Sequence, residues 1–260
     1  MEIIFQELYC QRVYEMTGSN DAKDIIVVVH DQLDFVKKCI DSLYLNTKNF
    51  NLYLWDNNSM APTRECLEEV AKTNDNVVLV RHSENIGFIA PNNELARHGK
   101  SPYIILLNSD TEVYPGWDTA LIGWLKENPK CALVGYQGGT LDPDGRGWSG
   151  ARYGDFLDYV CGWCLCLGRH TFNRYGLFDE KNLSFAYGED SDLSLRLQEA
   201  GFNIHSLHIK LVKHYGNVTS LEVQREMDTS YSFKRNHEYI RKRWESYLTN
   251  ERAALKVKTS

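Results

Sequence analysis

Short apolar runs alternate with helix-like segments along the first half of the chain, and each run ends in polar residues. The runs fall within residues 24–30, 51–56, 77–81 and 103–107. Between them, apolar residues recur at helical spacing, as in Phe35–Leu45. A short apolar run without polar interruption is typical of a strand buried on both faces, the usual condition in a parallel sheet. The pattern predicts a doubly wound α/β fold whose strands follow one another about 25–30 residues apart.

One of these runs, Tyr103–Leu107, leads directly into Asn108, Ser109 and Asp110. Ligands in open α/β sheets bind at the carboxyl ends of the strands, so a carboxylate at this position is placed for chemistry. A simpler interpretation is that the three polar residues cap a helix that follows. The stretch by itself favours neither interpretation.

An acidic cluster and a histidine in the second half of the chain are further candidate chemical groups. Glu189, Asp190 and Asp192 fall in the first turn of a predicted helix, where the helix dipole stabilises acidic side chains. Their closeness also raises the pKa of neighbouring carboxylates towards values that suit a general base. His214 ends a predicted strand, just as Asp110 follows one. A base and a ligand are therefore candidate roles, beside purely structural ones.

Three of the seven cysteines share one predicted strand, Tyr159–Leu167. The spacing of Cys161, Cys164 and Cys166 is compatible with a metal or redox site. However, cysteine is small and apolar enough to fill a buried strand, and no second pair at zinc-binding spacing is evident. We therefore interpret the three cysteines as core residues.

Composition narrows the class of protein. The 260 residues, 43% of them hydrophobic, are enough for one large α/β domain with a sizeable core. A net charge of −6 argues against a general nucleic-acid surface. The N-terminus has neither a basic leader nor a long apolar segment, and no apolar run approaches the ~20 residues that cross a bilayer. The odd number of scattered cysteines favours a reducing compartment, so we expect a cytoplasmic protein.

The C-terminal stretch Leu221–Leu248 is predicted to be helical and basic. Its cationic residues and a tryptophan are Lys234, Arg235, Arg241, Lys242, Arg243 and Trp244. Two roles fit this composition, a cover for the sheet and a peripheral contact with the anionic inner face of a membrane. We favour the cover.

Several short motifs together resemble the family-2 inverting glycosyltransferases of the GT-A fold. They are Val29–Gln32, Trp55–Ser59, Glu84–Phe88 with Asn93, Leu107–Val113, Gly176–Asp179, Tyr187–Leu193 and His214. Their order and spacing carry the resemblance, which points to the rhamnosyltransferase-like branch that builds surface glycans. It implies one GT-A (Rossmann-like) domain, residues 24–217, with a mixed, mainly parallel sheet flanked by helices. An N-terminal extension, 1–23, and a helical tail, 218–260, would flank this domain.

For the donor half, residues 24–117, the resemblance implies a site for a nucleotide-diphosphate sugar. The residues that would bind this donor are His30, Asp31, Asp56, Asn85, Gly87, Asn93, Asn108, Ser109 and Asp110. Asp31 stands where the family pattern has an asparagine. Asp56 would accept the N3 hydrogen of uracil or thymine, which favours a UDP- or dTDP-sugar.

The resemblance also implies a divalent cation. The family's Asp-x-Asp metal motif matches Asn108-Ser109-Asp110, so that Asp110 would bind the metal together with His214. Oxygen ligands suit Mg²⁺ or Mn²⁺, and an imidazole favours Mn²⁺. Such a cation neutralises the charge that develops on a diphosphate leaving group.

For the acceptor half, residues 118–217, the resemblance makes Asp190 the catalytic base and Glu189 a residue that holds the acceptor. Gly162 and Trp163 would lie beside the acceptor, which is a hydroxyl of a glycan, a lipid-linked sugar or a protein. A single displacement would invert the anomeric configuration. The glycine-rich stretch Gly138–Gly154 is interpreted as a crossover loop between the halves and as a lid over the donor.

Two other functions are weighed against a transferase. A sugar nucleotidyltransferase needs a glycine-rich, basic loop after the first strand, whereas His30–Asp34 is acidic and contains no glycine. A catalytically degenerate protein that binds a nucleotide sugar or glycan without turnover is the second alternative. The replacements at Asp31 and Asn108 keep it open.

Overall fold

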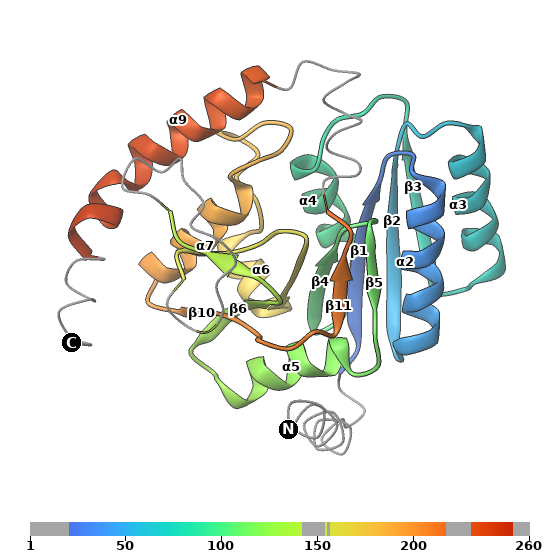
Figure 1. The fold of residues 1–260 in the computed structure, drawn as a ribbon, viewed down its shortest axis with the longest axis horizontal. Coiled ribbons are helices and arrows are strands. Elements are labelled where there is room, and N and C mark those ends of the chain that lie inside the picture. Colours follow the sequence, from blue (N-terminus) through green and yellow to red (C-terminus); the bar gives the residue numbers. More distant parts are fainter. Residues whose placement is uncertain (1–20, 142–153, 155–156, 217–229, 252–260) are drawn as a thin grey trace.

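The computed structural model describes residues 21–141, 154, 157–216 and 230–251. Within them, a seven-stranded sheet has the order β10-β6-β9-β4-β1-β2-β3 (Figure 1). Its strands are β1 (Lys23–Val29), β2 (Phe50–Asn57), β3 (Val77–His82), β4 (Tyr103–Leu107), β6 (Cys131–Gly135), β9 (Cys164–Gly168) and β10 (Asn203–Ser206). All neighbouring strands pair in parallel except β9, which runs antiparallel between β4 and β6. The predicted mixed, mainly parallel sheet is confirmed.

Helices cover both faces of this sheet (Figure 1). They are α2 (Leu33–Asn46), α3 (Ala61–Thr73), α4 (Ile89–His98), α5 (Trp117–Glu127), α6 (Arg169–Tyr175) and α7 (Glu189–Glu199). Successive side chains of a strand point to opposite faces. Ile25 and Val27 of β1 therefore pack in the core under α2, α3 and α5, whereas Ile26 packs in the core under α4, α6 and α7. The unbroken apolar run of β1 reflects burial on both faces.

Two short strand pairs lie outside the main sheet. They are β5 (Thr111–Val113) with β11 (Val212–His214) and β7 (Gly138–Gly139) with β8 (Tyr159–Val160). Because β5 follows Asp110 directly, the interpretation of Asn108–Asp110 as a helix cap is wrong. The next helix, α5, begins only at Trp117, after Gly116 has turned the chain with a φ of 85°.

The predicted strand Tyr159–Leu167 is two strands, β8 and β9, rather than one. Residues 161–163 connect the two strands and belong to neither. The N–H of Gly162 donates to the side chain of Asp190, and the carbonyl of Trp163 accepts the backbone N–H of Asn108. Cys164 and Cys166 lie in β9 and are fully buried as free thiols, in agreement with their interpretation as core residues.

The C-terminal helix α9 (Ser230–Ser246) and the π-helical turn Tyr247–Glu251 that extends it lie against α7 (Figure 1). Ile240, Trp244 and Leu248 form a stripe at helical spacing and are buried in the same core cluster as the apolar residues of α7. The prediction that the tail covers the sheet is therefore wrong in detail, since α9 covers α7. Within the described residues, no helix is both long and apolar enough to span a membrane.

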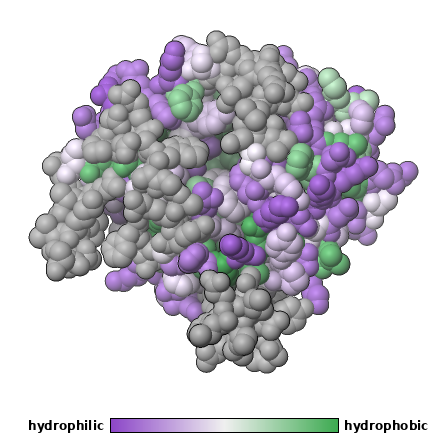
Figure 2. Space-filling view, in the orientation of Figure 1, coloured by the Kyte–Doolittle hydropathy of each residue, from purple (hydrophilic) through white to green (hydrophobic). Residues whose placement is uncertain are grey.

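Strands of the main sheet come from both predicted halves, with β1–β4 from residues 24–117 and β6, β9 and β10 from residues 118–217. The division into a donor half and an acceptor half stays a prediction. Three predicted segments lie partly outside the described part of the chain: residues 1–20 of the extension 1–23, residues 218–229 and 252–260 of the tail 218–260, and residues 142–153 of the lid. In the view of Figure 2, the surface of the described residues is mostly hydrophilic, and apolar residues are scattered over it.

Candidate active site

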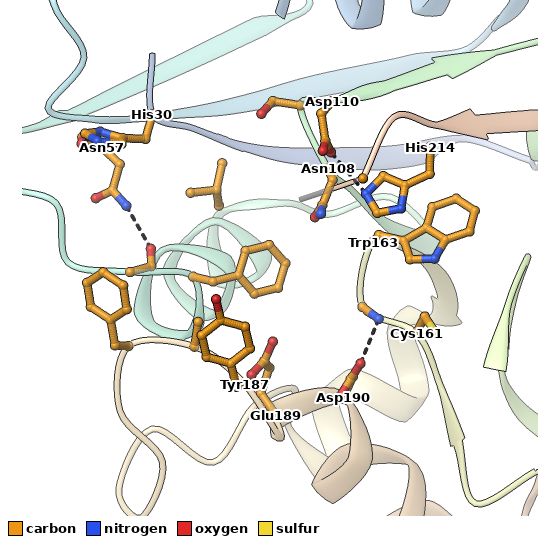
Figure 3. A pocket seen from close by; sticks show the side chains of 18 of the residues that line it. His30, Asn57, Asn108, Asp110, Cys161, Trp163, Tyr187, Glu189, Asp190 and His214 are labelled. Atoms are coloured by element: carbon orange, nitrogen blue, oxygen red, sulfur yellow. Dashed lines mark hydrogen bonds and ion pairs between the residues drawn. The ribbon is translucent and has the colours of Figure 1, made fainter. Parts of the chain in front are cut away.

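A cavity of about 400 Å³ opens where the carboxyl ends of β1, β2 and β4 face the start of α7 (Figure 3). Most of the residues predicted to form the site line it, namely His30, Asn85, Gly87, Asn108, Ser109, Asp110, Gly162, Trp163, Glu189, Asp190 and His214. Three predicted residues, Asp31, Asp56 and Asn93, do not line it. The parallel strands β1 and β4 bring His30 and Asn108–Asp110 to one edge of the sheet, as expected for an open α/β fold, and α7 and β11 add the acidic pair and His214.

Asp110 and His214 form one wall of the cavity (Figure 3). They meet because β11 pairs antiparallel with β5, which places His214 opposite Thr111. The backbone N–H of Tyr215 donates to the carbonyl of Asp110 at 2.9 Å and fixes this register. As a result, His214 Nε2 lies 3.2 Å from Asp110 Oδ1, and the aspartate side chain is almost fully buried.

The chemistry of this pair fits a divalent cation. His214 Nε2 is a buried nitrogen that makes no hydrogen bond within the described residues. A buried carboxylate suits manganese or magnesium, and an imidazole nitrogen without a hydrogen bond beside it favours manganese. The described residues contain no group of three or more histidine, cysteine, aspartate or glutamate side chains placed to hold a metal. Asp110 and His214 would therefore bind a cation only together with oxygens of a donor and water.

Trp163 supports the same wall. Its ring stacks on His214 with a centroid separation of 4.8 Å and an interplanar angle of 14°. Its carbonyl accepts the backbone N–H of Asn108 at 2.8 Å. Trp163 thus restrains both the imidazole and the polar turn that carries Asp110. Its predicted contact with the acceptor stays a prediction.

Glu189 and Asp190 form the opposite wall, in the first turn of α7 (Figure 3). Asp190 accepts hydrogen bonds from the backbone N–H of Gly162 at 3.0 Å and of Ser191 at 2.7 Å. Glu189 is buried, and its Oε2 atom has no hydrogen-bond partner among the described residues. The two carboxylates therefore differ, because both oxygens of Asp190 accept N–H bonds, whereas Glu189 has one buried oxygen without a partner among the described residues.

This difference decides which carboxyl carries a proton. Burial, reinforced by the charge of Asp190, raises the pKa of Glu189 to about 8. Burial also raises the pKa of Asp190, but the N–H groups of Gly162 and Ser191 oppose that rise by stabilising the ionised form. Near neutral pH, Glu189 is therefore the carboxyl of the pair that holds a proton.

On the side of β1 and β2, an asparagine that the sequence motifs did not single out organises the cavity. Asn57 donates through Nδ2 to Asn85 Oδ1 at 2.7 Å and to the carbonyl of Gly87 at 2.9 Å, and it accepts the N–H of Ile86 at 2.9 Å. Its own carbonyl lies 2.9 Å from His30 Nδ1. The alternation of side chains along β2 could have identified Asn57. Successive side chains of a strand point to opposite faces, so that Asn57 lines the cavity and Asp56 does not.

Asp31 and Asp56 hold the turn after β2. Asp56 Oδ1 accepts the N–H of Ser59 at 2.8 Å, and Asp56 Oδ2 lies 3.7 Å from Arg81 Nε. Asp31 Oδ1 accepts the N–H of Met60 at 2.7 Å. The roles of both aspartates towards a nucleotide stay predictions.

Asn93 lies in α4 and holds the segment after α6. Its amide donates to the carbonyl of Phe178 at 2.8 Å and to Glu180 Oε2 at 3.0 Å, and it accepts the N–H of Phe178 at 2.9 Å. These bonds give Asn93 a structural role, and its predicted contact with the nucleoside stays a prediction.

Aromatic side chains that were not predicted as site residues complete the lining. They are Phe88, Phe185 and Tyr187. Phe88 and Tyr187 belong to the motifs Glu84–Phe88 and Tyr187–Leu193, whereas Phe185 lies just before the second motif. Flat apolar faces beside a few convergent polar groups are typical of small-molecule sites.

Comparisons with known proteins agree with this geometry. The model of the family described as glycosyl transferase family 2 matches residues 24–181, more than half of the chain. Over 130 residues, 47% of the chain, the sequence is 29% identical to the poly(ribitol-phosphate) beta-glucosyltransferase of Bacillus spizizenii. The match spans only 20% of that longer protein.

Two solved structures share the fold. GalNAc-T7, solved with UDP, GalNAc and Mn²⁺, superposes with a TM-score of 0.65 at 17% identity, over 76% of this chain and 44% of its own. The mannosyltransferase PcManGT of Pyrobaculum calidifontis, solved with GDP-Man and Mn²⁺, gives a TM-score of 0.59 at 13% identity. This match covers 96% of this chain and 81% of PcManGT. The fold is the GT-A fold, and the chain belongs to glycosyl transferase family 2.

Proposed function

We propose that this protein is a metal-dependent, inverting glycosyltransferase. It transfers a sugar from a nucleotide-diphosphate sugar to an acceptor hydroxyl in one displacement, with Asp190 as the base. The observation that carries the proposal is the placement of the Asp110–His214 pair and the Glu189–Asp190 pair on opposite walls of one cavity. One wall suits a diphosphate with its cation, and the other suits a reacting hydroxyl.

Asp110 and His214 would hold the cation, and the imidazole favours Mn²⁺ over Mg²⁺. When bound, the cation neutralises the negative charge that develops on the departing diphosphate. The presence of Mn²⁺ in the solved structures of GalNAc-T7 and PcManGT supports this assignment. Asn108 is neutral, so this chain presents one carboxylate where the motif has two, and the donor diphosphate must supply more of the coordination.

Asp190 is suited to act as the base. The N–H groups of Gly162 and Ser191 fix its orientation, and burial raises its pKa and hence its basicity. Asp190 takes the proton of the acceptor hydroxyl while that oxygen bonds to the anomeric carbon. The bond from this carbon to the diphosphate oxygen breaks, and the nucleoside diphosphate leaves. Protonated Glu189 can donate a hydrogen bond to the acceptor without competing for its proton.

A UDP- or dTDP-sugar is the favoured donor, because the family resemblance assigns the N3 hydrogen of uracil or thymine to Asp56. Asp56 ends β2 outside the cavity lining, so this contact requires the nucleotide base to reach beyond the cavity. The acceptor is a hydroxyl of a glycan, a lipid-linked sugar or a protein. The relative from Bacillus spizizenii is named for glucose transfer to poly(ribitol-phosphate). UDP-glucose and a polyol-phosphate polymer therefore belong in any first set of trial substrates.

A thermal-shift screen of nucleotide sugars, each with and without Mn²⁺, tests the proposal. A donor that binds the native state raises the melting temperature, by an amount that grows with its concentration over Kd. We expect a UDP- or dTDP-sugar to give the largest shift and the shift to require Mn²⁺. Release of the nucleoside diphosphate from that donor then tests turnover. Binding without turnover of any acceptor would instead support a degenerate binding protein, the alternative that Asn108 favours.

A further inference from the structure

The C-terminal helix α9 contributes a fully buried asparagine, Asn236, that holds the loop 184–188 before α7. Asn236 Oδ1 accepts the backbone N–H of Ser184 at 3.1 Å. Its Nδ2 donates to three carbonyls, those of Ser184 at 2.8 Å, Ala186 at 2.9 Å and Tyr187 at 3.0 Å. One side chain from a distant helix therefore bonds the backbone of three of the four residues before Gly188.

This loop has a backbone that needs such support. Phe185 and Tyr187 have φ angles of 62° and 78°, in the left-handed region that residues other than glycine rarely occupy, and Gly188 follows with 87°. Residues with side chains keep this conformation only when their surroundings enforce it, and they gather at functional sites. Phe185, Ala186 and Tyr187 all line the cavity.

The other side of the loop contacts the donor wall. The carbonyl of Phe185 accepts the backbone N–H groups of Phe88 at 2.7 Å and Ile89 at 3.1 Å. Gly87 packs so tightly here that a Cβ atom on it would lie 2.5 Å from the Phe185 carbonyl oxygen. The loop thus joins α9 to the segment after Asn85, and its last residue is followed at once by Glu189.

We propose that Asn236 is a positioning residue for the transfer reaction, acting through the loop 184–188. The assignment rests on the proposed function for its catalytic consequence, although the structural link is independent of it. Asn236 sets where Phe185 and Tyr187 close the cavity and where α7 begins, and therefore where Glu189 and Asp190 face the donor wall. The C-terminal helix is in this way part of the active-site scaffold and not only a cover.

A second contact of α9 provides a matched control. Trp244 is buried on the same helix and donates through Nε1 to Asp192 Oδ1 at 3.1 Å. Asp192 lies on α7, and no described hydrogen bond joins Trp244 to the loop 184–188. The change Trp244→Phe removes one buried hydrogen bond between α9 and α7 and leaves the loop contacts in place.

Hydrogen exchange of the free, full-length protein tests the structural link without any substrate. In Asn236→Ala, we expect the amides of Ser184, Phe88 and Ile89 to exchange at least ~10-fold faster, because the loop that protects them opens locally. In Trp244→Phe, we expect the amides of Phe88 and Ile89 to stay within about 2-fold of wild type. Asn236→Ser keeps one donor and one acceptor and should give intermediate rates.

Two exchange results would overturn the inference. One is wild-type exchange at Phe88 and Ile89 in both Asn236 variants. The other is an increase in exchange at Phe88 and Ile89 that is no larger than the increase in the β1 core, which would indicate general destabilisation.

Hydrolysis of UDP-glucose with Mn²⁺ provides the kinetic readout. A displaced catalytic wall should lower kcat at least ~10-fold in Asn236→Ala and leave KM within about 3-fold, whereas Trp244→Phe should keep kcat within about 2-fold. Equal losses of kcat in the two variants would contradict a positioning role. Absence of turnover by the wild-type protein with every nucleotide sugar would count against the proposed function, and the exchange data would still decide the role of Asn236.

Discussion

His214 Nε2 lies 3.2 Å from Asp110 Oδ1, although Asp110 precedes β5 in the middle of the predicted domain and His214 ends β11 near its C-terminal limit. The pairing of β11 with β5 creates this contact, and the stacked ring of Trp163 restrains it. The imidazole nitrogen makes no hydrogen bond within the described residues. In the proposed function, this pair supplies part of a cation's coordination and a donor diphosphate completes it.

Removal of either ligand should abolish metal-dependent donor binding. We expect Asp110→Ala and His214→Ala each to weaken the binding of UDP in the presence of Mn²⁺ by at least ~100-fold, since the cation would then be held by the diphosphate and a single protein ligand. Isothermal titration calorimetry measures this change. Asp41→Ala, which removes an exposed carboxylate on α2, is the control and should bind as wild type does. Equal affinity with and without Mn²⁺ in the wild-type protein would show that the metal assignment is wrong.

Trp163 should act through His214. Residues that orient a metal ligand typically change metal affinity by about 10–100-fold. We therefore expect Trp163→Ala to weaken Mn²⁺-dependent UDP binding about 10-fold, and Trp163→Phe to retain most of the affinity because a ring still stacks on the imidazole. Mn²⁺ titrations at fixed UDP concentration compare the two variants. A larger loss for the phenylalanine variant than for the alanine variant would contradict a stacking role.

The raised pKa of Glu189 makes a prediction about stability. Burial lifts this pKa from 4.5 to about 8, so the folded state binds the proton more tightly than the unfolded state does. The stabilisation is complete below the unfolded pKa and is lost as the pH rises towards 8. Urea denaturation should show that wild type loses roughly 1–4 kcal/mol more than Glu189→Gln between pH 5 and pH 8.5.

Identical pH dependence in wild type and Glu189→Gln would mean that Glu189 does not hold its proton in the folded state. Glu199→Gln removes an exposed carboxyl at the other end of α7 and serves as the control. It should keep the pH dependence of wild type, because it leaves the buried Glu189 carboxyl in place.

The main sheet and much of the candidate site were predictable because both depend on local patterns. The apolar runs of β1, β2 and β4 required burial on both faces, and parallel pairing then brought the following polar residues to one edge. His30, Asn108 and Asp110 are examples whose place in the cavity follows from this rule alone.

Contacts between distant segments were not predictable in the same way. The break in the run Tyr159–Leu167 depends on Asp190 and Asn108, which lie on other elements, so its uninterrupted apolar character gave no local sign of it. Likewise, nothing in the helical pattern of the tail indicates that Asn236 bonds the loop before α7. The aromatic lining by Phe88, Phe185 and Tyr187 also depends on such contacts, because the loop that carries two of these rings is held against the segment after Asn85.

The central claim is that Asp190 removes the acceptor proton while the opposite wall binds the donor. Replacing Asp190 by asparagine keeps the size of the side chain and removes the base. With the donor chosen by the thermal-shift screen, kcat for transfer should fall at least ~100-fold while Mn²⁺-dependent donor affinity, measured by calorimetry, stays within about 3-fold. A transfer rate equal to that of wild type in Asp190→Asn would contradict the account.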